Sequence, residues 1–181
     1  MNRLEIEKTL NEDRAWLIDA YAALGDAELT DPVTPSEHDD SKTWNAKDHL
    51  VHLILIERNW NNMIRRHIAG EKDTVGLGSA KLGKERTREE IMAGVHKWTE
   101  SWADKHRTDS LDEIVALGQS ARAETLQLLS ELTQEQLDDK IPGAPWADGV
   151  TGGIIEANAG HGRMHWNWVK EGREKAASAK R

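Results

Sequence analysis

Two histidines, His161 and His165, are the residues whose types and spacing most directly suggest chemistry in this sequence. Positions four apart in a helix share one face, so two imidazole nitrogens can converge there on a single cation. They belong to a seam with a polar centre and apolar ends, formed by Ile154, Asn158, His161, His165 and Trp168. A buried polar group that lacks a partner costs roughly 2–7 kcal/mol, so these side chains require either hydrogen bonds or a bound ion.

His52 is the candidate for a third ligand, because it lies early in a second amphipathic segment on the side that can face the last helix. Three imidazoles from two helices would leave coordination positions open, which distinguishes a catalytic zinc from a closed structural site. Nitrogen ligands suit zinc or nickel, whereas calcium and magnesium prefer oxygen. From these residues alone, a metal centre and a hydrogen-bonded polar core are both open interpretations.

The elements that must position these histidines are helices. Apolar periodicity predicts helices over residues 2–24, 45–69, 88–107 and 110–132, and a last one from about 151 onward. Capping residues mark three of the starts, at Asn45, at Thr87 with Glu90, and at Ser110 with Glu113. The segments 26–43, 71–86 and 133–149 show no such period, and we expect loops there. The predicted fold class is therefore all-α, a four-helix bundle whose long crossover carries the extra helix at 88–107.

Length and composition indicate one soluble domain over residues 1–181, with 38% hydrophobic and 31% charged residues. We expect residues 171–181 to form a solvated basic tail. The longest apolar run, Leu50–Ile56, is interrupted by His52 and is far shorter than the roughly 20 residues that span a bilayer. The N-terminal residues show no export signal, so the sequence predicts a cytoplasmic location.

Charge and cysteine content exclude several classes of function. A formal net charge of −8 disfavours nonspecific binding to nucleic acid. The chain has no cysteine, which rules out disulfides, thiolate zinc ligands and a cysteine nucleophile. Any thiol chemistry would therefore need an external thiol. We expect a small-molecule substrate, no nucleic-acid or membrane partner, and a homodimer as the candidate assembly.

The segment Trp44–Leu53 resembles a motif of DinB-like proteins in which a Trp and a Lys-Asp pair precede a histidine of the second main helix. His52 takes the place of that histidine, while His161 and His165 match the paired histidines of the family's last main helix. The stretch LGDAELTDPV resembles the family's usual approach to the second helix. The resemblance implies a down-and-back bundle with a long crossover, and it favours a divalent metal, Zn or Ni, at these three histidines.

DinB-like proteins, with the similar mycothiol-dependent maleylpyruvate isomerases and bacillithiol transferases, are associated with a divalent metal and with low-molecular-weight thiols. The resemblance thus implies a metal-dependent enzyme, a thiol S-transferase or a hydrolase that acts on a small electrophile. The alternative hypothesis is a non-catalytic or metal-free bundle that binds a small molecule for protection, since some DinB-like relatives belong to that class.

Several other side chains have roles that the sequence leaves open. Asp48, Glu57 and Glu156 are all candidates for a general base, and none is singled out. Asp48 also lies one turn before His52, where it could orient an imidazole or cap its helix. The tryptophans are expected in the core, with candidate pocket walls at Trp44, Trp146 and Trp166.

The histidines outside the proposed triad are expected to have ordinary roles. His49 and His67 fit satisfied core or surface positions. His38, His96 and His106 are expected in solvent.

Overall fold

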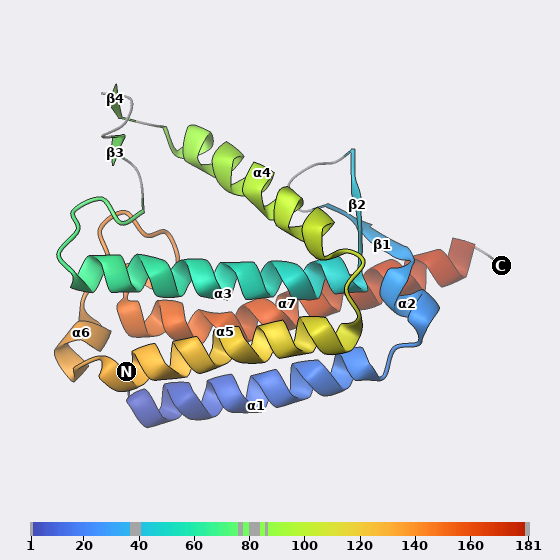
Figure 1. The fold of residues 1–181 in the computed structure, drawn as a ribbon, viewed down its shortest axis with the longest axis horizontal. Coiled ribbons are helices and arrows are strands. Elements are labelled where there is room, and N and C mark those ends of the chain that lie inside the picture. Colours follow the sequence, from blue (N-terminus) through green and yellow to red (C-terminus); the bar gives the residue numbers. More distant parts are fainter. Residues whose placement is uncertain (1, 37–40, 76–77, 80–83, 86, 180–181) are drawn as a thin grey trace.

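The computed structural model describes residues 2–36, 41–75, 78–79, 84–85 and 87–179. Four long helices form a bundle: α1 (Arg3–Ala22), α3 (Ala46–Ile68), α5 (Leu111–Glu131) and α7 (Thr151–Ala179). As Figure 1 shows, α1 and α7 run in one direction and α3 and α5 run in the other. The predicted all-α bundle is confirmed.

The crossover runs from the C-terminus of α3 back along the bundle to the N-terminus of α5. These two helices are therefore parallel (Figure 1). It contains the short strands β3 (Gly78–Ser79) and β4 (Lys84–Glu85), followed by α4 (Arg88–His106). The extra helix predicted in the crossover is α4. It packs on α3, where the indole Nε1 of Trp102 donates a hydrogen bond to the carbonyl oxygen of Val51 at 3.1 Å.

The segment predicted as a loop over residues 26–43 contains regular structure instead. The helix α2 (Asp26–Thr30) begins after Gly25, whose N–H donates to the Glu28 carboxylate at 2.8 Å. The strands β1 (Pro32–Pro35) and β2 (Thr43–Asn45) then form an antiparallel hairpin. Elements of three to five residues are too short to produce a recognisable apolar period, which is why the sequence did not reveal them.

The other expected loop, 133–149, also contains short helices. They are α6 (Gln134–Asp138), capped by the Thr133 hydroxyl, and the 3₁₀ helix η1 (Ala147–Gly149) directly before α7. Residues 171–179, expected as a solvated tail, continue α7. Most of them are exposed, but Gly172 is buried against β1 and Arg173 pairs with Glu28.

Apolar side chains of the main helices form two clusters, one toward each end of the bundle. The first includes Ile6, Ile64, Leu128 and Ile154. The second includes Leu17, Ile54, Ile114 and Val169. Burial of such side chains stabilises the fold by about 1.5–3 kcal/mol each, so the bundle can hold polar groups between its helices without losing its packing.

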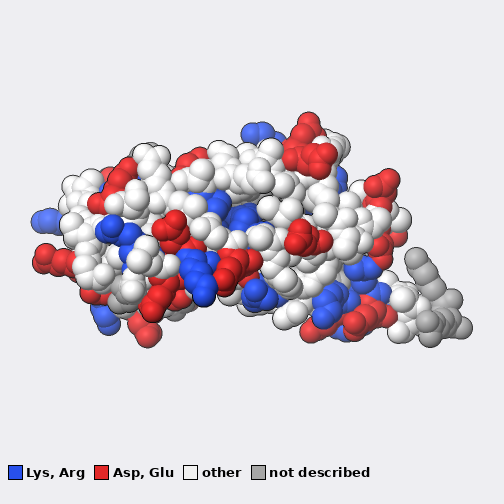
Figure 2. Space-filling model, turned by 90° about the horizontal axis from the view of Figure 1, so that it is seen from below, with Lys and Arg blue, Asp and Glu red and all other residues white. Residues whose placement is uncertain are grey.

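The outer surface carries charges of both signs. On the face shown in Figure 2, Lys and Arg side chains are interspersed with Asp and Glu, and the described part of that face has no continuous basic strip. Among the described residues, no helix is both long enough and apolar enough to cross a membrane.

Candidate metal centre

The three histidines predicted as ligands lie together between α3 and α7. His52 comes from the second turn of α3, and His161 and His165 come from successive turns of α7. One ring nitrogen from each side chain lies within 4.8 Å of the others. His52 and His165 are buried and His161 is partly exposed, so the cluster has one side nearer to solvent.

The start of α3 is held firmly, which fixes where His52 enters the bundle. The Asn45 side chain accepts a hydrogen bond from the Asp48 N–H at 2.9 Å, and the Asp48 carboxylate accepts one from the Asn45 N–H at 3.0 Å. Lys47 donates to the carbonyl oxygens of Arg107 and Asp109 at 3.2 and 2.6 Å. The Lys-Asp pair before His52 therefore anchors the helix rather than contributing a ligand.

A chain of hydrogen bonds runs through the cluster and extends beyond it. His165 Nε2 lies 3.0 Å from His161 Nε2, and His165 Nδ1 lies 2.9 Å from His49 Nδ1. His49 Nε2 is in turn 2.8 Å from the hydroxyl oxygen of Thr34 on β1. His49 is a satisfied core histidine, as predicted, but its bond to His165 was not predicted. Its position three residues before His52 on α3 was the available signal, since such residues share a helix face.

Burial keeps imidazoles of this site neutral. It lowers the pKa of both His49 and His161 from 6.5 to about 4, because the charged imidazolium loses its hydration. At neutral pH each of these rings therefore keeps one nitrogen unprotonated, with its lone pair available. A neutral imidazole is the form that binds a metal ion.

The arrangement fits a divalent ion. Nitrogen ligands lie about 2.0–2.1 Å from zinc, so two of them cannot be more than roughly 4.2 Å apart. The 3.0 Å between the Nε2 atoms of His165 and His161 is within that limit. The 4.8 Å that bounds the whole set exceeds it, so the rings would have to draw slightly closer together around an ion. Three neutral nitrogen donors also match the ligand preference of zinc and nickel.

Aromatic rings enclose the cluster. Trp44 is fully buried, and its ring centroid lies 5.3 Å from that of His52. Trp60 stacks on His161 with centroids 5.9 Å apart, and Trp146 packs on Trp60. Trp44 thus walls the site as predicted, while the ring contact of Trp146 is with Trp60. The rings shield the histidines from bulk water on these sides.

Trp166 packs against the apolar core, as expected of the tryptophans, and not against the histidine cluster as a pocket wall. Its ring packs against Tyr21 and Trp16 of α1, with centroids 5.1 and 6.3 Å apart. Trp168 instead contacts His165, with centroids 4.7 Å apart. Neighbouring positions on α7 face different helices, so the sequence distance to the histidines did not decide which indole would wall the site.

None of the three carboxylates proposed as a general base is bonded to the cluster in the described hydrogen-bond network. Glu57 is buried on the opposite side of α3, where it accepts from Arg122 Nε and from the Thr125 hydroxyl, both at 2.7 Å, and also pairs with Arg14. Asp48 caps α3, and burial raises the pKa of its carboxyl. Glu156 is partly exposed. The expectation that Asp48 orients an imidazole gains no support from these contacts.

His67 and His106 have polar partners away from the cluster. His67 is close to Asp139, with Nε2 and Oδ2 2.9 Å apart, at the surface as predicted. His106 was expected in solvent, but its ring packs on Trp102 and its Nδ1 lies 2.7 Å from Asp109, so that expectation is wrong. His96 is half-buried, and His38 lies outside the described residues.

Comparison with known protein families identifies the family of this chain. The model of the DinB superfamily matches residues 37–169, which include all three clustered histidines. The chain belongs to the DinB superfamily. The match confirms the resemblance inferred from the Trp44–Leu53 segment and the paired histidines. A search of curated proteins finds no match.

Two solved structures share the fold of this DinB-superfamily chain. One is an uncharacterised protein from Escherichia coli UTI89, with 15% identity, a TM-score of 0.61, and 97% of this chain and 95% of that chain covered. The other is the sibling lethal factor precursor DfsB, with 12% identity, a TM-score of 0.61, and 97% of each chain covered. At these identities the likeness shows the fold alone.

Proposed function

We propose that this protein is a metal-dependent enzyme of the DinB superfamily, in which His52, His161 and His165 hold one divalent ion, zinc or nickel. The observation that carries the proposal is the convergence of three ring nitrogens from two helices within 4.8 Å. Three protein ligands leave coordination positions open for a small molecule, as in catalytic rather than structural zinc sites.

The proposed chemistry is transfer of an external thiol, or of water, to a small electrophile. A bound divalent ion lowers the pKa of a thiol or a water that it binds and so supplies a nucleophile at neutral pH. The chain has no cysteine, so a thiol would come from a low-molecular-weight donor. The residues of this chain bind and orient: Trp44 and Trp60 exclude water beside the histidines, and His49 holds the His165 ring in place.

A metal-free binding bundle is the second candidate, and one observation favours it. The chain of imidazoles satisfies hydrogen bonds internally, from Thr34 through His49 and His165 to His161. Such a network can exist without an ion and would let the bundle sequester a small molecule without chemistry. The two candidates differ in one respect that can be measured: the first requires enzymatic activity that depends on the bound metal, and the second does not.

The test is a reconstitution assay. Untagged protein is stripped with a chelator, reloaded with zinc or nickel, and assayed with a chromogenic aryl halide and a panel of low-molecular-weight thiols, and separately with activated esters and amides. The proposal expects turnover only in reloaded protein and none with His161→Ala. His67→Ala is the matched control, since that histidine lies away from the cluster. Equal turnover in stripped and reloaded protein would contradict the proposal.

A further inference from the structure

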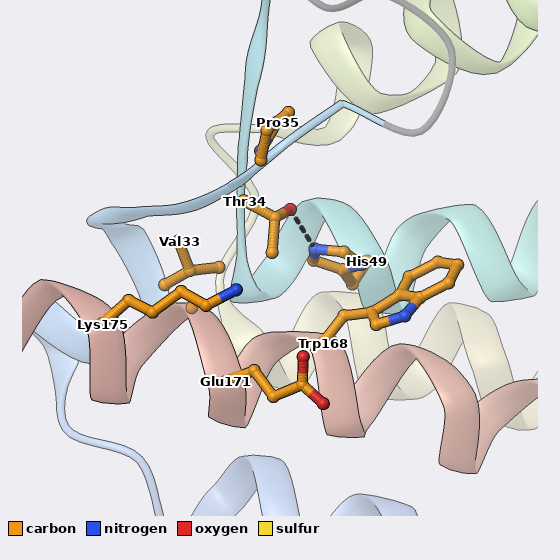
Figure 3. Close-up of a pocket in the computed structure, with 8 residues that line it drawn as sticks. Val33, Thr34, Pro35, His49, Trp168, Glu171 and Lys175 are labelled. Carbon is orange, nitrogen blue, oxygen red and sulfur yellow. Dashed lines mark hydrogen bonds between the residues drawn. The ribbon is translucent and has the colours of Figure 1, made fainter.

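A cavity of about 320 Å³ lies on the far side of His49 from the three-histidine cluster. It is bounded by the start of α3, the C-terminal part of α7 and the strand β1 (Figure 3). Its size falls at the lower end of the range of about 300–1,000 Å³ that is typical of small-molecule sites. The cavity therefore has room for a small ligand rather than for a macromolecular segment.

Close packing of β1 on α7 builds this cavity. A Cβ placed on Gly172 would overlap the carbonyl oxygen of Val33, so only glycine permits this approach. The contact holds Thr34 over the cavity, where its hydroxyl bonds to His49. His49 is 1% exposed, so this side of the cavity borders the protein interior.

Two opposite charges reach into the same space. Glu171 and Lys175 are one turn apart on α7, and both line the cavity. In Figure 3 the Lys175 ammonium points toward Thr34 while the Glu171 carboxylate lies below Trp168. No ion pair joins Glu171 to Lys175 in the described part of the chain, although a Glu–Lys spacing of four is the usual one for pairing on a helix.

These two charges disfavour any ligand that carries only a positive charge or only a negative charge. A simple acid would be attracted by Lys175 but repelled by Glu171, and a simple amine would meet the reverse. A molecule with both groups satisfies both side chains. The remaining walls are the apolar surfaces of Val33, Pro35 and Trp168, which suit an apolar substituent.

We propose that this cavity binds a small zwitterion of the amino-acid type that carries an apolar side chain. Its carboxylate pairs with Lys175, its ammonium pairs with Glu171, and its side chain packs on Trp168 and Pro35. The inference goes beyond the proposed metal chemistry and does not require a bound metal.

Calorimetric titration of the full chain with chelator present tests the proposal. The probes are phenylalanine and leucine, with 3-phenylpropionate and 2-phenylethylamine as analogues that each lack one charge. Phenylalanine or leucine should bind, and each single-charge analogue should bind at least about tenfold more weakly than phenylalanine, because a charge-assisted contact is lost. Failure of both amino acids to bind at millimolar concentration would overturn the proposal.

Variants at the two charges sharpen the test. Lys175→Met and Glu171→Gln should each weaken amino-acid binding about tenfold or more, and Glu171→Gln should improve binding of 3-phenylpropionate because the repulsion is removed. Lys170→Met and Glu174→Gln are matched controls, since both residues are exposed on α7, like Glu171 and Lys175, but do not line the cavity. Binding that is unchanged in both cavity variants would overturn the proposal. With chelator present throughout, either outcome leaves the metal proposal to its own test.

Discussion

Replacement of His49 tests whether hydrogen bonding beyond the ligands supports the metal centre. If His165 binds the ion through Nε2, its proton resides on Nδ1 and is donated to His49 Nδ1 across 2.9 Å. His49 must then carry its own proton on Nε2 and donate it to Thr34 at 2.8 Å. Leucine at position 49 removes the acceptor, whereas asparagine carries its amide oxygen in the place of Nδ1.

The expected magnitude follows from burial. His165 and His49 are 0% and 1% exposed, so water cannot replace the lost bond. An unsatisfied buried donor costs about 1–3 kcal/mol, which corresponds to a loss of roughly 5- to 150-fold in metal affinity. A loss of about 10- to 100-fold, within this range, is typical when a partner of a metal-bound histidine is removed. His49→Asn should retain most of the wild-type affinity.

The assay is competition for zinc with a chromogenic chelator, with far-UV circular dichroism and thermal melting of the apo proteins as controls for the fold. Thr34→Val should also weaken zinc binding, because His49 then loses the acceptor that fixes its tautomer, and Thr34→Ser should restore it. Equal affinity in the wild type and His49→Leu would refute the reasoning. Equally weak binding in the Leu and Asn variants would show that packing matters and the hydrogen bond does not.

Three further predictions concern stability. Burial depresses the pKa of His49 and His161 from 6.5 to about 4. Between pH 4 and pH 6.5 the unfolded apo chain therefore binds more protons than the folded apo chain. Urea unfolding with chelator should therefore show stability falling as pH drops from 6.5 to 4, by roughly 3 kcal/mol per histidine; constant stability would contradict this. Glu57→Gln leaves the buried Arg122 without its carboxylate and should destabilise the fold by about 3–5 kcal/mol without altering zinc affinity; a fall in zinc affinity among folded molecules would place Glu57 in the site. Gly172→Ala should cost about 1–3 kcal/mol in denaturant unfolding because β1 must move away from α7; unchanged stability would show that this contact is soft.

The main helices could be predicted because their signals are local. The predicted helix over 45–69 is α3 at Ala46–Ile68, and the capping pairs Thr87–Glu90 and Ser110–Glu113 mark the observed starts of α4 and α5. The hairpin of β1 and β2 could not be predicted in the same way. Its strands pair residues that are distant in the sequence, and each strand is too short to show alternation.

The site was predictable as a set of ligand candidates but not as a network. The spacing of His161 and His165 and the family motif around His52 sufficed to nominate the cluster. The contacts of His49 with His165 and of Glu57 with Arg122 depend on how α3 is rotated against α7 and α5. Sequence periodicity gives a helix face but not the partner that this face meets.

Metal content is the most direct measurement of the central claim. The metal content of protein purified without an affinity tag is measured by inductively coupled plasma mass spectrometry. The variants His52→Ala and His161→Ala and the control His67→Ala are measured beside it. We expect about one zinc or nickel per chain in the wild type and the control, and a large loss in both cluster variants while helicity is retained. Wild-type protein that binds no divalent ion after reloading, or cluster variants that keep a full equivalent, would contradict that claim.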